Sequence, residues 1–244
     1  MKSFLLALNF LTRIPMPFIK EIASERQMAS CLTFFPVVGL LIGLIVAITD
    51  SVTSRLFNIS VASALDLVLL FAVTGGLHTD GLMDTVDGML SGKAKDKMLE
   101  IMKDSRVGAL GTSVAILTFI LKFALLAALM GKHRFAALML FPSFGRWAIV
   151  PGIVFFPYAR RVGLGKSFWS HSGRKEFLAA TFLALAFAII LFPQRGALAL
   201  LAAGTASLLM SKLSTRTLGG LTGDVYGAIN ELAEVAALMV FAAM

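Results

Sequence analysis

Three aspartates follow directly after an apolar run, in the stretch "GGLHTDGLMDTVDG" at 75–88. Asp80, Asp84 and Asp87 are spaced i, i+4 and i+7, so a helix would confine them to an arc of about 60°. Between Gly75 and Lys93 there is no lysine of the kind that relieves repulsion on a solvated acidic face. Oxygen ligands without cysteine or clustered histidine predict Mg²⁺ or Mn²⁺ bound together with a phosphate. The alternative is that these acids solubilise a helix leaving a membrane.

A second acidic motif, "GGLTGDVYGAINELAE", lies near the C-terminus. Asp224 and Glu231 repeat the i, i+7 spacing, and Glu234 follows one turn later. Glu231 and Glu234 fall at the start of an apolar segment, where an unpaired carboxylate is costly and usually functional. Pairing with an intramembrane base such as Lys122 or Arg146 is the alternative. The two acidic motifs also align with each other, which indicates either a structural duplication or chance.

Basic residues that could contact phosphate accompany these acids. "KDSRVG" places Lys103 and Arg106 around Asp104, a mixture expected where anionic oxygens and a metal are bound together. Arg146 in "FPSFGRW" and Arg160 in "YARRVGLGKSF" are further candidates for phosphate contacts. The chemistry indicated by such a set is metal-assisted phosphoryl or phosphodiester transfer.

His78 stands two residues before Asp80. It is a candidate general base or metal ligand. A purely structural histidine is the alternative.

The composition predicts that these residues are positioned by membrane helices. Of the 244 residues, 58% are hydrophobic and 15% charged, with a mean hydropathy of +0.87, whereas soluble domains carry roughly 25% charged residues. We expect an all-α, polytopic integral membrane protein forming one domain over 1–244. Its candidate spans number about seven: 31–49, 61–77, 111–130, 135–157, 177–193, 196–210 and 227–243. Cys31 is the only cysteine, which excludes an intramolecular disulfide.

Charge asymmetry predicts the orientation of the chain in its membrane. The N-terminal segment and the connections on its side carry 16 Lys and Arg residues, and the opposite connections carry 4. The positive-inside rule therefore places the N-terminus and the acidic motifs on the cytoplasmic face. The net charge of +8 comes from residues flanking apolar spans, and no basic patch interleaved with aromatics stands apart from them. We therefore expect a lipid bilayer as the environment and no nucleic-acid partner.

Five motifs together resemble the cobalamin synthase family, the adenosylcobinamide-GDP ribazoletransferases. They are "FLTRIPMP", "GGLHTDGLMDTVDG", "IMKDSRVGALG", "YARRVGLGKSF" and "GGLTGDVYGAINELAE", in order from residue 10 to residue 234. Thr79 stands where family members often have leucine. The resemblance implies a multi-pass enzyme of the cell inner membrane that requires Mg²⁺. It would join adenosylcobinamide-GDP to α-ribazole or α-ribazole 5′-phosphate, giving adenosylcobalamin or its 5′-phosphate and releasing GMP.

The motif match gives the positions of the site, and charge and geometry suggest the tasks. The acids expected to bind the metal are Asp80, Asp84, Asp87, Asp104 and Asp224. The bases expected to neutralise phosphate oxygens are Lys103, Arg106, Arg160 and Arg146. The residues expected nearest the chemistry are His78, Asp84, Asp87, Asp224 and Glu231.

Two other functions remain as alternatives. A CDP-alcohol phosphotransferase would use similar chemistry, but its DGxxAR signature is absent because "DGLMDT" has Asp84 in place of the alanine. A cation-coupled transporter would carry its acids in mid-span. The sequence leaves open the number of metal ions, the contacts of the corrinoid ring, the form of ribazole used and the oligomeric state, a homo-oligomer included.

Overall fold

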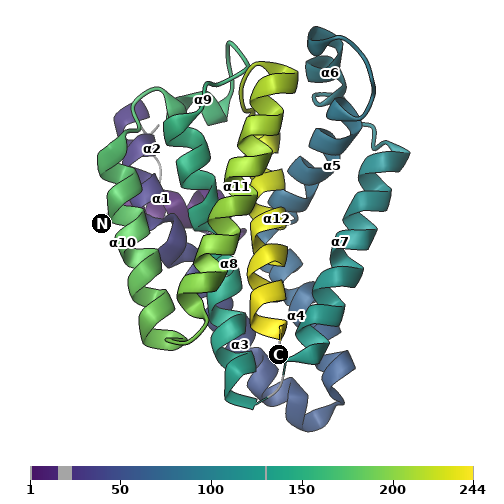
Figure 1. Ribbon diagram of the computed structural model, residues 1–244, viewed down its shortest axis with the longest axis vertical. Coiled ribbons are helices and arrows are strands. Elements are labelled where there is room, and N and C mark those ends of the chain that lie inside the picture. The colour runs from purple at the N-terminus through teal and green to yellow at the C-terminus, as the bar shows by residue number, and fades with distance from the viewer. Residues whose placement is uncertain (1, 16–23, 130, 244) are drawn as a thin grey trace.

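The computed structural model describes residues 2–15, 24–129 and 131–243, and its regular structure there is helical (Figure 1). The helices in chain order are α1 (Lys2–Leu11), α2 (Glu25–Cys31), the short 3₁₀ helix η1 (Leu32–Phe34), α3 (Phe35–Leu56), α4 (Ile59–Thr74), α5 (Leu77–Met89), α6 (Lys95–Ile101), α7 (Ala109–Ala128), α8 (Gly131–Phe155), α9 (Leu164–Trp169), α10 (Arg174–Leu191), α11 (Gly196–Leu218) and α12 (Gly223–Ala242).

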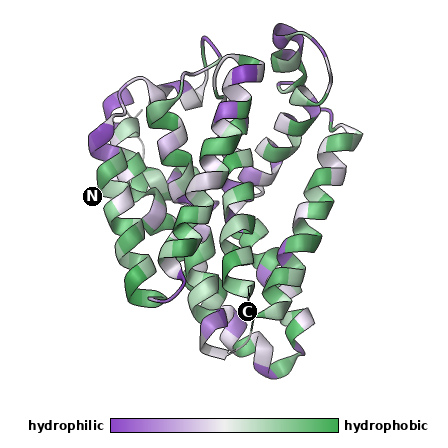
Figure 2. Cartoon of the chain, viewed as in Figure 1, coloured by the Kyte–Doolittle hydropathy of each residue, from purple (hydrophilic) through white to green (hydrophobic). Residues whose placement is uncertain are grey.

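The all-α, polytopic class is confirmed. Among the described helices, five are long and apolar enough to cross a membrane, and a sixth span results if α4 and α5, bent by 88°, are taken together. All seven predicted spans fall on helices, but α10 starts with the charged run Arg174, Lys175 and Glu176 and does not qualify. Hydrophobic residues predominate along the long helices and hydrophilic ones gather towards their ends (Figure 2).

Helix α11 extends eight residues beyond the predicted end of its span. The apolar run stops at Met210, but the helix continues through "SKLSTRTL" to Leu218. Its C-cap is Gly219 in the left-handed conformation, with φ of 77°, which glycine adopts without steric cost. The apolar run therefore shows how far the apolar surface of the helix extends, and it does not show where the helix ends.

Helix α8 is the central element of the bundle and packs against α3, α10, α11 and α12. Its contact with α3 is close because Gly39 and Gly43 of α3 face its backbone. A Cβ at Gly39 would lie 2.4 Å from the Pro142 carbonyl oxygen. Small residues at such positions let membrane helices approach and pack along their length.

Two glycine pairs set the directions of the helices that carry the acidic motifs. Gly75 and Gly76 have φ values of 65° and 68° and form the bend between α4 and α5. Gly219 and Gly220 occupy the corresponding place between α11 and α12, both with positive φ. The alignment of the two motifs thus has a counterpart in local structure, since each pair ends one helix and starts the next.

The α11–α12 connection is also tied to the loop after α8. Tyr158 and Leu221 form an isolated parallel bridge, in which Leu221 donates to the Pro157 carbonyl and Ala159 donates to the Leu221 carbonyl, both at 2.8 Å. Helices α6 and α9 and the α11–α12 connection lie at the same end of the bundle (Figure 1). The bridge therefore brings the "YARRVGLGKSF" loop against the start of α12.

Candidate active site

The three aspartates of the first motif lie on α5, as their spacing predicts. Asp80 is exposed, and Asp84 and Asp87 are half-buried. Within the described ranges, neither Asp80 nor Asp84 has a hydrogen-bond or ion-pair partner. These two carboxylates therefore remain free to bind a ligand.

Asp87 differs from Asp80 and Asp84 on the same helix because it has hydrogen-bond partners. Its two carboxylate oxygens accept hydrogen bonds from the backbone N–H groups of Gly108 at 2.9 Å and Gly111 at 2.8 Å. These donors lie at the start of α7, where N–H groups lack intrahelical partners and favour an anion. A Cβ at Gly108 would lie 2.3 Å from the Asp87 carboxylate. Asp87 thus fixes the first turn of α7 against α5.

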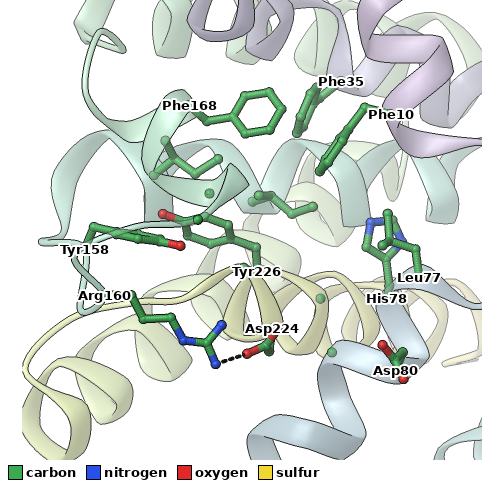
Figure 3. Close-up of a pocket in the computed structure, with 17 residues that line it drawn as sticks. Phe10, Phe35, Leu77, His78, Asp80, Tyr158, Arg160, Phe168, Asp224 and Tyr226 are labelled. Atoms are coloured by element: carbon green, nitrogen blue, oxygen red, sulfur yellow. Dashed lines mark hydrogen bonds and ion pairs between the residues drawn. The ribbon is translucent and has the colours of Figure 1, made fainter. Parts of the chain in front are cut away.

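Asp224 faces the α5 acids from the first turn of α12. The N-cap of this helix is Thr222, whose hydroxyl accepts from the Val225 N–H at 3.3 Å. Arg160 donates to Asp224 at 2.6 Å and is also 3.5 Å from the Met102 carbonyl oxygen. The Arg160–Asp224 pair is drawn in Figure 3, with Asp80 on the neighbouring helix.

The acids of the two motifs act on one another electrostatically. The charges that act on the Asp84 carboxyl include those of Asp80, Asp87, Asp224 and Arg160. Asp84 and these three aspartates therefore place four carboxylates in one region, and Arg160 is the one base among the charges named. This excess of negative charge favours a cation.

The "KDSRVG" residues lie between α6 and α7, at the edge of this region. Arg106 donates to the Asp104 carboxylate through three side-chain contacts, 2.5 Å from Nη2 to Oδ2, 3.0 Å from Nε to Oδ1 and 3.1 Å from Nε to Oδ2. This pairing lowers the pKa of Asp104 to about 2. Lys103 and Arg106 are exposed. The structure thus pairs Asp104 with a neighbouring base and leaves Lys103 facing solvent.

Glu231 and Arg146 belong to a buried polar network beneath the α5 acids. Lys122 of α7 donates to Glu231 at 2.7 Å and to Glu234 at 2.5 Å. Arg146 of α8 pairs with Glu234 as well, and its Nη2 lies 3.4 Å from Nδ1 of His78. Two bases thus balance two acids. The structure realises the alternative in which Glu231 and Glu234 pair with intramembrane bases, and it does not bring Arg146 to the surface of the site.

A cavity of about 250 Å³ opens beside Asp80 and Asp224. Five aromatic side chains contribute to its wall: Phe10, Phe35, Tyr158, Phe168 and Tyr226. Burial raises the pKa of the Tyr158 hydroxyl, which therefore stays protonated at neutral pH. These side chains could not be predicted as a group because they are scattered from residue 10 to residue 226. The signal in the sequence was that all of them except Phe35 fall within the motifs "FLTRIPMP", "YARRVGLGKSF" and "GGLTGDVYGAINELAE".

A preformed metal cage is not present in the part of the chain that the structure describes. No group of three or more His, Cys, Asp or Glu side chains there is arranged to hold a metal ion. Mg²⁺ is, however, usually bound by one or two carboxylates together with waters and substrate phosphates. Asp80 and Asp84, one helical turn apart and unpaired, fit that mode of binding, and the metal site remains a prediction.

The fold and the site define a class: a polytopic membrane protein with an acidic and basic site at one end of its helical bundle, beside an aromatic cavity. Comparison with known families gives the narrower assignment. The family described as "Cobalamin-5-phosphate synthase" matches residues 3–242. The chain belongs to this family.

Curated relatives cover almost the whole chain. A protein of Roseiflexus sp. is 41% identical over 95% of this chain and 86% of its own. One of Acetivibrio thermocellus is 39% identical over 99% and 97%, and one of Desulfitobacterium hafniense is 38% identical over 98% and 96%. All three carry the name adenosylcobinamide-GDP ribazoletransferase. No solved structure matches the chain.

Proposed function

We propose that this protein is an adenosylcobinamide-GDP ribazoletransferase, which joins adenosylcobinamide-GDP to α-ribazole or α-ribazole 5′-phosphate and releases GMP. The family match over residues 3–242 and the names of the relatives support this function. The observation that carries it in the structure is the pair of unpartnered carboxylates, Asp80 and Asp84, facing the Arg160–Asp224 pair. This arrangement suits a substrate with a diphosphate.

Mg²⁺ is part of the proposal. Asp80 and Asp84 would hold it, with the diphosphate oxygens of the substrate as further ligands. When bound, it supplies charge neutralisation of the diphosphate and of the departing GMP. Asp87 is not needed as a ligand, because its oxygens hold the start of α7.

Arg160 and Asp224 exchange partners when the diphosphate arrives. Arginine donors match phosphate oxygens in pairs, so Arg160 turns from Asp224 to the phosphate. The release of Asp224 leaves a carboxylate at the cavity mouth that orients a ribazole hydroxyl and accepts its proton. The hydroxyl oxygen bonds to the phosphorus nearest the cobinamide. The bond from that phosphorus to the bridging oxygen breaks, and GMP leaves with that oxygen.

The location proposed is the cell inner membrane, with the site on the cytoplasmic face. The α6, α9 and α11–α12 region lies at one end of the bundle together with the site (Figure 1). The segments on this side carry 16 of the basic residues, against 4 in the opposite connections, which favours a cytoplasmic position.

The function is tested with purified protein in detergent, given adenosylcobinamide-GDP and α-ribazole 5′-phosphate. We expect GMP release with Mg²⁺, and one new corrinoid product for each GMP. Chelator should abolish both, and added Mg²⁺ should restore them. Folded protein that releases no GMP, or that releases GMP without a new corrinoid, would contradict the proposal.

A further inference from the structure

The aromatic cavity beside the acids has a shape and lining of its own. Phe10 of α1, Phe35 of α3 and Phe168 of α9 pack together, with ring centroids 4.8 Å apart for Phe10 and Phe168 and 5.8 Å apart for Phe35 and Phe168. Tyr158 and Tyr226 form a second pair, 6.4 Å apart. Figure 3 shows the two tyrosines between the phenylalanines and the Arg160–Asp224 pair. Four helices and a loop thus supply a lining suited to a flat ring system.

Among the aromatic side chains of this lining, Tyr226 carries a polar atom that lacks a partner in the described part of the protein. The hydroxyl of Tyr226 is buried and, among the described residues, has no hydrogen-bond partner. Its side chain lines the cavity. A buried hydroxyl without a hydrogen-bond partner is costly. We therefore expect a ligand to supply the missing partner of this hydroxyl.

His78 presents a second donor to the same cavity. Its Nδ1 lies 3.4 Å from Nη2 of Arg146, and a guanidinium only donates hydrogen bonds. Nδ1 therefore accepts, and the proton of the neutral ring is on Nε2. That atom has no partner among the described residues. His78 thus offers an N–H to a ligand instead of the lone pair that a general base or metal ligand needs.

We infer that this cavity binds the benzimidazole base of the ribazole substrate, with the Tyr226 hydroxyl donating to the unsubstituted ring nitrogen. The inference rests on the proposed function and assigns a place to one of its two substrates. The base is a flat bicycle with two methyl groups and one exposed nitrogen lone pair. Aromatic walls bury its apolar surface, and the ring nitrogen, its only polar atom, accepts a hydrogen bond from the Tyr226 hydroxyl.

The other ring systems of the reaction fit this cavity less well. Guanine presents an edge of N–H donors that needs acceptors, and the carboxylate acceptors here, Asp80 and Asp224, lie at the polar end with Arg160 (Figure 3). The corrin macrocycle is too large for about 250 Å³. With the base inside, the ribose lies at the mouth, where its hydroxyl meets Asp224.

The test separates the two substrates kinetically. In purified Tyr226→Phe, we expect KM for α-ribazole to rise about 3- to 10-fold, as for the loss of one neutral hydrogen bond, with KM for adenosylcobinamide-GDP unchanged. Phe168→Ala should raise the same KM further. Phe182→Ala, an exposed aromatic on α10, is the matched control and should change neither constant. A rise confined to adenosylcobinamide-GDP, or no change in Tyr226→Phe, would overturn the inference.

Binding measurements keep this inference separate from the proposed function. If the wild-type protein releases no GMP, the function fails, and equilibrium dialysis of α-ribazole alone then decides the cavity. Saturable binding that weakens in Tyr226→Phe, with GMP binding unaffected, supports the assignment. No saturable binding to the wild type, or equal binding to both proteins, refutes it.

Discussion

At the scale of single residues, the acids of this protein fall into two groups. Asp80 and Asp84 have no described partner, whereas Asp87, Asp104, Asp224, Glu231 and Glu234 each have at least one. Asp87, held by backbone N–H groups, and Glu231 and Glu234, held by buried bases, are mainly structural, because their oxygens are already satisfied. The unpaired ones keep their charge available for a ligand.

Glu234 is the central acid of the buried network, since Lys122, Arg146 and Asn230 all contact it. Replacing it as Glu234→Gln leaves two buried bases with Glu231 as their one remaining acid in this network. We expect a loss of about 3–5 kcal/mol of stability, the usual effect of breaking a buried ion pair. Thermal unfolding in detergent measures this.

A control variant and a double variant test whether the loss of stability comes from the buried ion pairs of Glu234. Glu100→Gln removes an exposed acid of α6 and should leave the melting temperature close to that of the unaltered protein, because exposed ion pairs contribute little to stability. The double variant Glu234→Gln with Arg146→Met should recover part of the loss, because it removes the unpaired base. Equal melting temperatures for Glu234→Gln and Glu100→Gln would contradict the role of Glu234.

At the scale of helices, the site depends on the close packing of α5 against α12. A Cβ at Gly81 would lie 2.7 Å from the Asp224 carbonyl oxygen, and one at Gly227 would lie 2.9 Å from that of His78. Both clashes involve backbone, which cannot move aside independently. These two glycines therefore bring the acids of the two motifs to one place.

Gly227→Ala should push α5 and α12 apart. We expect a large loss of activity and a smaller loss of stability. A displacement of about 1 Å can cost roughly 100-fold in rate, whereas overpacking costs about 1–3 kcal/mol. GMP release and thermal unfolding measured on one preparation test the contrast. Gly173→Ala is the control, since a Cβ there would meet only Glu176, at 3.8 Å. Full activity in Gly227→Ala would show that this close packing is not required.

The placement of Asp80, Asp84 and Asp87 on one face of α5 could be predicted, because the spacing of three positions on one helix determines it. The partners of these acids could not, since they come from distant segments: Gly111 is 24 residues from Asp87, and Arg160 is 64 residues from Asp224. About seven spans were predicted, and the difference from the five or six apolar helices among the described residues lies in two places: α10 includes a charged first turn, and α4 qualifies as a span only together with α5.

At the scale of the whole molecule, one end of the bundle carries the chemistry and the other carries a separate buried cluster. There Arg134 of α8 pairs with Asp50 and Asp66, each at 2.7 Å. This triad joins α3, α4 and α8 at a distance in the fold from the α5 acids. A buried base held by two acids fixes the mutual position of helices, so we assign this cluster to structure.

The orientation in the membrane is tested by labelling single cysteines in a Cys31→Ala background. Lys97→Cys on α6 and Ser54→Cys near the end of α3 are both exposed positions. With an impermeant maleimide, we expect Lys97→Cys to react only in inside-out vesicles and Ser54→Cys only in intact spheroplasts. The reverse pattern would place the site on the outer face.

The most direct test of the central claim, that the transfer requires the α5 carboxylates Asp80 and Asp84, is GMP release by Asp84→Asn under saturating substrates and Mg²⁺. We expect activity to fall by roughly 100-fold or more, as when an electrostatic contact to a transition state is lost. Thermal stability should be equal or higher, because Asp84 has no described partner and its charge is repelled by Asp80, Asp87 and Asp224. Asp96→Asn, an exposed acid on α6, should keep full activity. Full activity in folded Asp84→Asn would contradict the account.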